Sequence, residues 1–271
     1  QGIDFREIPH PDAEMLSDPS FTVLSRYWVP EGEVEQKLAG RWDRGWLLGW
    51  RDITNATNER TIIASVLPRA GVGHKFPLFI TDSVKPQLLV SLFANLNTFA
   101  LDYIARQKVG GTSLTYFYLR QFPVISPQTF EEQRTWLLES WSDWIASRVL
   151  ELVYTTHDMN PFASDLGYDG PPFRWDEERR FLLRCELDAA FFHLYGIDYD
   201  GVDYIMDSFF TLKRRTEAAY GEYRTKRVIL DIYGAMARAI ETGEPYQTRL
   251  DPPPADPRVA HVELAYPAAG S

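Results

Sequence analysis

Residues 106–124 read RQKVGGTSLTYFYLRQFPV and combine three features. A predicted helix ends in a basic run at Arg106 and Lys108, and Gly110 and Gly111 follow, where the backbone can take positive φ and approach another molecule closely. An aromatic and basic segment then runs as far as Pro123. Cations, backbone amides and flat rings together suit a phosphate chain that carries bases, so we predict a nucleic-acid contact here. The alternative is a glycine helix stop followed by a buried strand or helix.

The composition of the 271-residue chain is that of a folded protein with a sizeable core, because 45% of the residues are apolar and 14% are aromatic. Cys185 is the only cysteine, which excludes an internal disulfide and a cysteine-based zinc site and favours a reducing, cytoplasmic location. The sequence has no apolar run of membrane-spanning length and no signal peptide, so we expect no membrane partner. The chain begins at Gln1 without a Met, so we expect a processed protein or a piece of a longer one.

The net charge of -10 argues against nonspecific nucleic-acid binding by the whole molecule. The charge is unevenly distributed, however: residues 41–120 hold 10 Lys and Arg against 5 Asp and Glu, whereas residues 121–271 hold 15 against 25. Charges more than about 10 Å apart are screened at ordinary salt, so a basic face on an acidic body can still bind a phosphate backbone locally.

The pattern of apolar residues predicts an α+β fold, with a small N-terminal β-sheet and helices followed by a mainly helical C-terminal half. We predict strands over residues 21–30, 46–51 and 61–68, with a fourth over 75–80, and then one long helix that opens at Pro86 and ends at the basic run. A capping box of Thr129 and Glu132 predicts a helix that runs to about His157. Asp176 is predicted to cap the next helix, and the remaining helices are expected over residues 200–209 and 222–242.

Four segments are expected along the chain: a linker over residues 1–20, a β-rich core with one long helix over 21–127, a helical subdomain over 128–245, and a flexible tail over 246–271. The chain lacks a Walker loop, a dinucleotide-binding glycine motif, a nucleophile elbow and a zinc-protease helix, so we predict no catalytic residue and no metal site.

Polar residues between two predicted strands are a second candidate contact. The loop between these strands contains or is flanked by Arg51, Asn55, Thr57 and Arg60. Arg and Asn side chains can pair with guanine and adenine edges. The alternative is a turn in which Asn and Thr side chains bond their own backbone. A nearby loop that ends at Lys75 is also flexible and cationic.

These motifs together resemble the C-terminal part of large adenine-N6 DNA methyltransferases of restriction–modification and phage-defence systems, which carry a TaqI-like target-recognition region after the methylase core. The resemblance covers residues 20–245 and is carried by RYWV at 26–29, RDITNATNERT at 51–61, RQKVGGT at 106–112, YFYLRQFPV at 116–124, ELDAA at 186–190, HLYG at 193–196 and GEYRTKR at 221–227. The glycine-rich cofactor loop and the Asn/Asp-Pro-Pro-aromatic catalytic motif of that family are missing from this sequence.

The resemblance implies a DNA sequence-recognition module without its catalytic domain, in which residues 21–127 form the target-recognition core. The partners would be double-stranded DNA and the methyltransferase domain of the same parent chain, and S-adenosylmethionine would be the cofactor of that parent enzyme only. We expect Phe117 and Leu119 to be core residues. The predicted DNA contacts are Arg51, Asn55, Thr57, Arg60, Lys75, Arg106, Lys108, Gly110, Gly111, Thr112, Tyr116, Tyr118 and Arg120. The alternative function is a protein-interaction module that docks a partner subunit of a defence complex.

Overall fold

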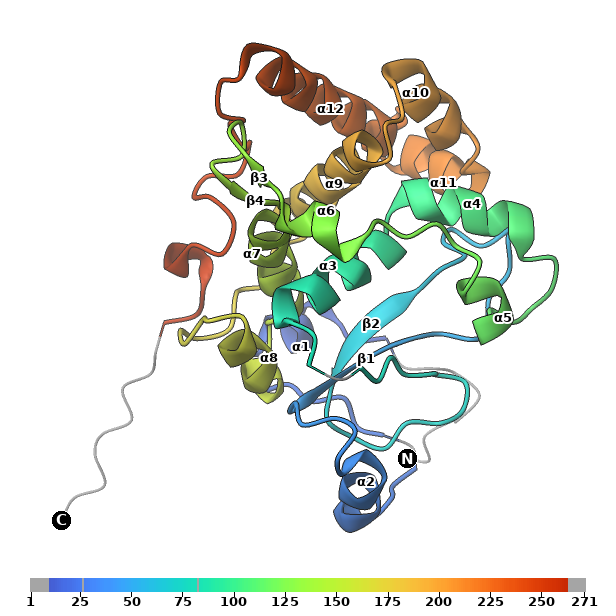
Figure 1. Cartoon of the computed structure of the whole chain (residues 1–271), viewed down its shortest axis with the longest axis vertical. Helices are drawn as coiled ribbons and strands as arrows, with labels where there is room; N and C mark the ends of the chain where they lie inside the picture. Colours follow the sequence, from blue (N-terminus) through green and yellow to red (C-terminus); the bar gives the residue numbers. More distant parts are fainter. Residues whose placement is uncertain (1–9, 26, 82, 263–271) are drawn as a thin grey trace.

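The computed structural model describes residues 10–25, 27–81 and 83–262 and has the predicted α+β fold (Figure 1). The N-terminal half contains α1 (Ala13–Ser17), α2 (Glu31–Leu38), β1 (Trp46–Trp50), β2 (Ala64–Pro68), α3 (Pro86–Leu96), α4 (Phe99–Lys108), α5 (Tyr116–Leu119) and α6 (Pro127–Glu131). The mainly helical remainder contains β3 (Gln133–Arg134), β4 (Glu139–Ser140), α7 (Trp141–Val153), η1 (His157–Met159), α8 (Asn160–Asp165), α9 (Glu177–Leu194), α10 (Tyr199–Asp207), α11 (Phe210–Tyr220), α12 (Arg224–Thr242) and η2 (Pro257–Val259).

Strands β1 and β2 form an antiparallel pair, with Trp46 opposite Pro68 and Trp50 opposite Ala64. Every residue of β1 is buried, as expected for a short apolar run that is covered on both faces. The predicted strand over residues 75–80 lies beside β1 but makes only one bridge, between Gly49 and Leu78. A Cβ at Gly49 would lie 2.4 Å from the carbonyl oxygen of Pro77, so glycine allows this close approach.

The predicted strand over residues 21–30 is wrong, because residues 21–25 and 27–30 follow an irregular path. Val23, Leu24 and Trp28 are 81%, 80% and 78% exposed. β-Branched and aromatic residues favour strands when they pack on a half-buried pleated surface, and these side chains have no such surface. Arg26, which belongs to one of the sequence motifs, and residues 1–9 of the predicted linker lie outside the described residues.

The single long helix predicted after Pro86 is instead two helices, α3 and α4, which are bent by 59° relative to each other. The side chain of Asn97 hydrogen-bonds the backbone of Ala64 in β2 and of Phe93, and the amide N–H of Phe99 donates to Asp188 at 2.7 Å. These side-chain bonds replace the helical ones at the break. In the described part of the chain no single helix is long and apolar enough to cross a membrane, although α3 and α4 together meet the same criterion by length and composition.

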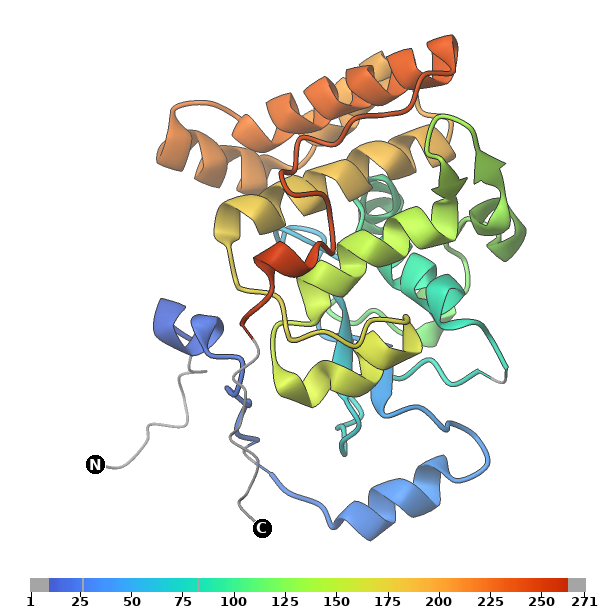
Figure 2. The same ribbon diagram turned by 90° about the vertical axis from the view of Figure 1, so that its left-hand side faces the viewer.

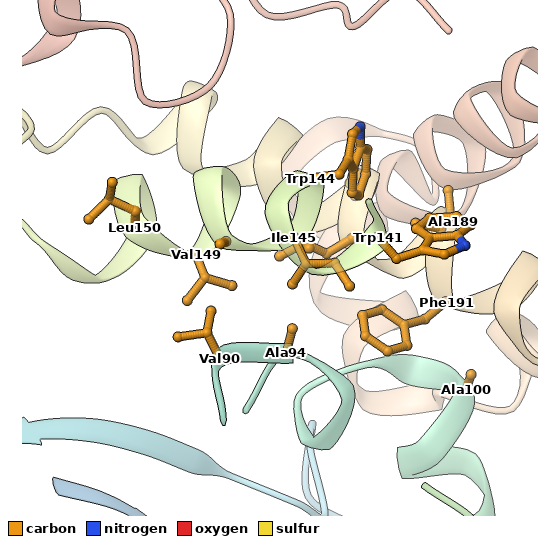
Figure 3. Packing of buried hydrophobic residues seen from close by; sticks show 14 of the residues in the cluster. Val90, Ala94, Ala100, Trp141, Trp144, Ile145, Val149, Leu150, Ala189 and Phe191 are labelled. Carbon is orange, nitrogen blue, oxygen red and sulfur yellow. The ribbon is translucent and has the colours of Figure 1, made fainter. Parts of the chain in front are cut away.

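Helix α7 begins later than predicted and lies at the centre of the core. Ser126 caps the short α6, which ends before Glu132, and Ser140 caps α7 by accepting a hydrogen bond from the amide of Asp143. The predicted capping box is therefore wrong, because Ser126 occupies the N-cap position of that helix and a short hairpin follows it. Figure 3 shows Ile145 and Val149 of α7 pointing toward Val90 and Ala94 of α3.

Helices α12, α9 and α7 lie one above the other (Figure 2), and α9 makes the most extensive packing contact of the fold with α12. The side chain of Asp176 caps α9 by accepting from the amide of Arg179, as predicted. Gly196 ends this helix with a φ of 65°, a conformation that glycine adopts without a steric penalty.

Residues 246–262 of the predicted flexible tail are packed onto the helices (red in Figure 2), and residues 263–271 lie outside the described part of the chain. The buried carboxylate of Glu186 in α9 holds this segment by accepting hydrogen bonds from the hydroxyls of Tyr246 at 2.8 Å and Thr248 at 2.5 Å. The same carboxylate pairs with Arg148 of α7 at 2.8 Å, and both charged side chains are at most 5% exposed. One buried carboxylate thus joins α7, α9 and the C-terminal segment.

We predict that Glu186→Gln lowers the free energy of unfolding by about 3 kcal/mol, because it leaves the buried guanidinium of Arg148 without a counter-charge. Urea denaturation monitored by circular dichroism measures the loss. Glu178→Gln is the matched control, because Glu178 lies on the same helix with its side chain 58% exposed beside Arg224. The control is expected to change stability by less than about 0.5 kcal/mol. Equal effects of the two substitutions would contradict the role given to Glu186.

Candidate functional site

The structure brings together three stretches that the sequence singled out as DNA contacts. Ile53 and Ser113 form an antiparallel bridge, and the amide of Thr54 donates to the carbonyl of Thr112 at 3.0 Å. The amide of Asp52 donates to the carbonyl of Lys75 at 2.9 Å, which adds the third stretch. These three stretches, residues 51–60, 71–75 and 106–120, form what we call the loop face.

A small core supports the loop face from beneath. Trp50, Leu101 and Leu114 are completely buried there, and the indole N–H of Trp50 donates to the carbonyl of Leu114 at 2.7 Å. Tyr116 of α5 packs edge-on against Trp50, with ring centroids 4.8 Å apart, and its hydroxyl donates to the carbonyl of Leu78. The loops are therefore fixed by packing and hydrogen bonds rather than only by their ends.

Most of the predicted contacts on the loop face are open to solvent. Lys75 is 49% exposed and pairs with Asp52 at 2.7 Å, and Tyr118 is half-buried. Phe117, which we expected in the core, is 71% exposed, because the short α5 presents it away from Trp50. The exposed predicted contacts are Arg51, Asn55, Thr57, Lys108, Gly110, Gly111, Thr112, Tyr116 and Arg120.

Asn55 forms the side-chain-stabilised turn that was the alternative prediction for this loop. Its side-chain oxygen accepts from both the amide and the hydroxyl of Thr57, each at 2.9 Å. The side-chain NH2 group of Asn55 makes no hydrogen bond within the described residues, so it remains a donor for another molecule. The turn thus holds Asn55 in place without using both of its polar groups.

Arg106, a predicted phosphate contact, faces into the protein instead of outward. Its side chain is only 10% exposed and donates to the carbonyls of Asn58 at 2.6 Å and Glu59 at 2.7 Å. The guanidinium also pairs with Asp102 at 3.3 Å and lies 4.2 Å from the ring centroid of Phe209. Its donors are occupied by the protein itself, so Arg106 clamps the loop to α4 instead of contacting a ligand.

Gly110 and Gly111 are exposed, but neither uses the positive φ that is open to glycine. A Cβ at either position would meet nothing within 4 Å, so the fold does not require glycine there. Val109, which is buried, ends α4 by donating its amide to the carbonyl of Ala105. The glycine pair therefore contributes accessible backbone rather than an unusual conformation.

The side chain of Arg60 also points into the protein, where it lines a cavity. Its guanidinium lies 3.3 Å from the ring centroid of Phe99 and 3.5 Å from the carboxylate of Asp188 in α9. These three residues line a cavity of about 990 Å³ between β2, the α3–α4 junction, the end of α7 and the first half of α9. We call it the arginine cavity, because its lining includes Arg51, Arg60, Arg180, Arg184 and Arg215.

The cationic side chains of the arginine cavity influence one another. Burial and, to a smaller extent, the neighbouring charge of Arg184 together lower the pKa of Arg180 to about 10. Burial and the charge of Arg60 lower the pKa of Arg184, although its side chain is open to the solvent that enters the cavity. Arg180 also stacks on Trp175, with 3.6 Å between the guanidinium carbon and the ring centroid.

Two acidic groups face these cations. Burial raises the pKa of Asp188 to about 6, while Arg60 and the amide of Phe99 oppose that shift. Glu59 pairs with Arg215 at 2.6 Å. The thiol of Cys185 also lines the cavity, and burial raises its pKa, which keeps it protonated.

Sequence reasoning missed the contribution of α9 to the cavity. Arg180 and Arg184 are four residues apart, so they lie on the same side of the helix, and two like charges at this spacing destabilise an isolated helix. That unfavourable pair was the available signal. Their proximity to Arg60, 120 residues earlier in the chain, depends on the tertiary fold.

Comparisons of the chain with protein-family models, curated proteins and solved structures give no match. Among residues 10–25, 27–81 and 83–262, no three His, Cys, Asp or Glu side chains are placed to hold a metal ion. The side chains described above form two candidate surfaces, the polar loop face and the concave arginine cavity.

We predict that Arg106→Met lowers the free energy of unfolding by about 3 kcal/mol, because the part-buried hydrogen bonds to the carbonyls of Asn58 and Glu59 are lost and Asp102 loses its ion-pair partner. Lys108→Met, two residues along at the exposed end of α4, is the control and is expected to change stability by less than about 0.5 kcal/mol. Thermal unfolding of both variants provides the measurement. A stable Arg106→Met protein with reduced DNA affinity would instead restore the contact predicted from sequence.

We predict that the stability of the wild type relative to Asp188→Asn falls as pH rises from about 4 to about 7. The unfolded carboxyl has a pKa of 3.8 and the folded one a pKa of about 6, so the folded protein alone retains the proton in this interval. Ionisation then costs the folded wild type about 3 kcal/mol, a loss that the Asp188→Asn variant avoids because its amide cannot ionise. Urea titrations of both proteins at several pH values measure the difference, and parallel pH curves would contradict the burial given to Asp188.

Proposed function

We propose that this chain is the DNA sequence-recognition module of an S-adenosylmethionine-dependent adenine-N6 methyltransferase, without the catalytic domain. The observation that carries the proposal is the loop face, in which three separately predicted stretches are hydrogen-bonded side by side. Catalysis and the cofactor would belong to the methyltransferase domain of the parent chain. The resemblance of the ordered sequence motifs supports the same class.

The chemistry of the loop face suits a duplex. Arg51, Lys108 and Arg120 supply exposed cations for phosphates, and the free amide NH2 of Asn55 is a donor of the kind that reads base edges. Tyr116 and Phe117 add exposed rings beside them. Arg60 and Arg106, which face inward, are withdrawn from the set of proposed DNA contacts.

Duplex binding measured by band shift at several salt concentrations tests this function. We expect the triple variant Arg51→Gln, Lys108→Gln and Arg120→Gln to bind more weakly and with a log–log salt slope that is shallower by about 2 to 3, because each lost phosphate contact removes about 0.9 from the slope. All three side chains are exposed, so folding is expected to be unaffected.

The matched control removes the same charge from the C-terminal half, with Arg134→Gln, Arg238→Gln and Arg249→Gln. It should leave the slope unchanged. Equal slopes for the wild type and both triple variants would overturn the assignment of the loop face to DNA.

A protein-interaction module that docks a subunit of a defence complex is the second candidate. It is favoured by the exposed apolar side chains of Val23, Leu24 and Trp28, which lie outside the loop face. For this candidate, Leu24→Ser with Trp28→Ser would abolish co-purification of the partner, and the loop-face triple variant would not.

A further inference from the structure

We propose that the arginine cavity binds a phosphorylated small molecule of nucleotide size, through the guanidiniums of Arg180 and Arg184. This goes beyond the proposed DNA recognition, because Arg180 and Arg184 are not among the proposed DNA contacts and the site is concave, although Arg51 borders both surfaces. The shared chemistry is a di- or triphosphate group, whether carried by a free nucleotide or by pyrophosphate itself.

The charge of the cavity is the first argument. Two ion pairs, Arg60 with Asp188 and Arg215 with Glu59, account for both acidic side chains that line it. Within the described residues no carboxylate lies within ion-pair distance of Arg51, Arg180 or Arg184, although the charge of Glu177 acts on both Arg180 and Arg184 from farther away. The cavity therefore holds a surplus of three positive charges in a chain whose net charge is -10.

Unused hydrogen-bonding capacity is the second argument. Arg184 makes no hydrogen bond or ion pair with the described part of the chain, and Arg180 uses one nitrogen, which donates to the carbonyl of Leu152 at 2.9 Å. Nε of Arg180 and Nη1 of Arg60 are buried without a partner. Unpartnered buried polar groups and mutually repelling cations raise the free energy of the ligand-free protein, and an oxyanion would relieve both.

The size of the cavity is the third argument. About 990 Å³ lies at the upper end of the usual range for small-molecule sites, which is roughly 300 to 1,000 Å³. Inorganic phosphate alone would leave most of this space empty. Apolar walls from Phe93, Phe181 and Ile62 leave room for an organic group beside the phosphates.

Substitution of Asp188 is expected to change phosphate affinity in the opposite direction to substitution of the arginines. Its carboxylate competes with a bound anion for Arg60, from which it is 3.5 Å away. Replacing it with Asn removes that competition and one negative charge from the cavity. We therefore expect Asp188→Asn to tighten phosphate binding under the same conditions in which the arginine substitutions weaken it.

Calorimetric titration of the chain with ATP, pyrophosphate and inorganic phosphate at pH 7.5 tests the proposal. We expect ATP and pyrophosphate to bind with a Kd below about 1 mM, and Arg184→Gln to raise that Kd by about tenfold or more. Arg184→Lys keeps the charge and should raise it less. Asp188→Asn should lower the Kd several-fold, and the surface control Arg238→Gln should leave it unchanged.

Absence of binding by ATP and pyrophosphate at millimolar concentration would overturn the proposal, as would a Kd that Arg180→Gln and Arg184→Gln both leave unchanged. Binding of a 5′-phosphorylated duplex that depends on Arg184, without any nucleotide binding, would also overturn it and assign the cavity to DNA. The double variant Lys108→Gln with Arg120→Gln separates the two proposals. It should impair DNA binding while leaving the ATP titration unchanged, because neither side chain lines the cavity.

Discussion

The buried carboxylate of Asp102 is the constraint on which both candidate surfaces depend. It is 1% exposed and accepts hydrogen bonds from the amides of Thr61 and Ile62, which fixes the chain just before β2 against α4. It also pairs with Arg106, whose guanidinium in turn holds the carbonyls of Asn58 and Glu59. Burial raises the pKa of Asp102, while the charge of Arg60, the amide of Ile62, the charge of Arg106 and the amide of Thr61 oppose that shift.

That constraint gives one short loop two sides with different chemistry. Asn55 and Thr57 lie on the outer side, where they bond each other and remain open to solvent. Arg60 lies on the inner side, over Phe99 and close to Asp188. A basic residue in this loop can therefore be a surface cation or part of a concave site. Which of the two positions it takes is set by the hydrogen bonds to Asp102 rather than by residue type.

Helix α9 has a comparable double role. Its buried residues pack against α7 and α12, and Glu186 anchors the C-terminal segment. Nearer its N-terminus the same helix presents Arg180 and Arg184 to the cavity. A helix so firmly packed positions its charged residues rigidly, which lowers the entropic cost of organising a binding site. The stability of the helical half and the geometry of the cavity thus rest on the same element.

The sequence by itself determined the fold class, strands β1 and β2 and the Asp176 cap of α9, because apolar spacing and capping act over a few residues. It did not determine the break between α3 and α4, the burial of Arg106 or the exposure of Phe117. Those depend on partners such as Ala64, Asn58 and Trp50, which lie tens of residues away in the chain. Only the tertiary structure decided which cations became internal clamps, which stayed on the surface and which gathered around a cavity, because an arginine is placed by the carbonyls, carboxylates and rings that the fold brings to it.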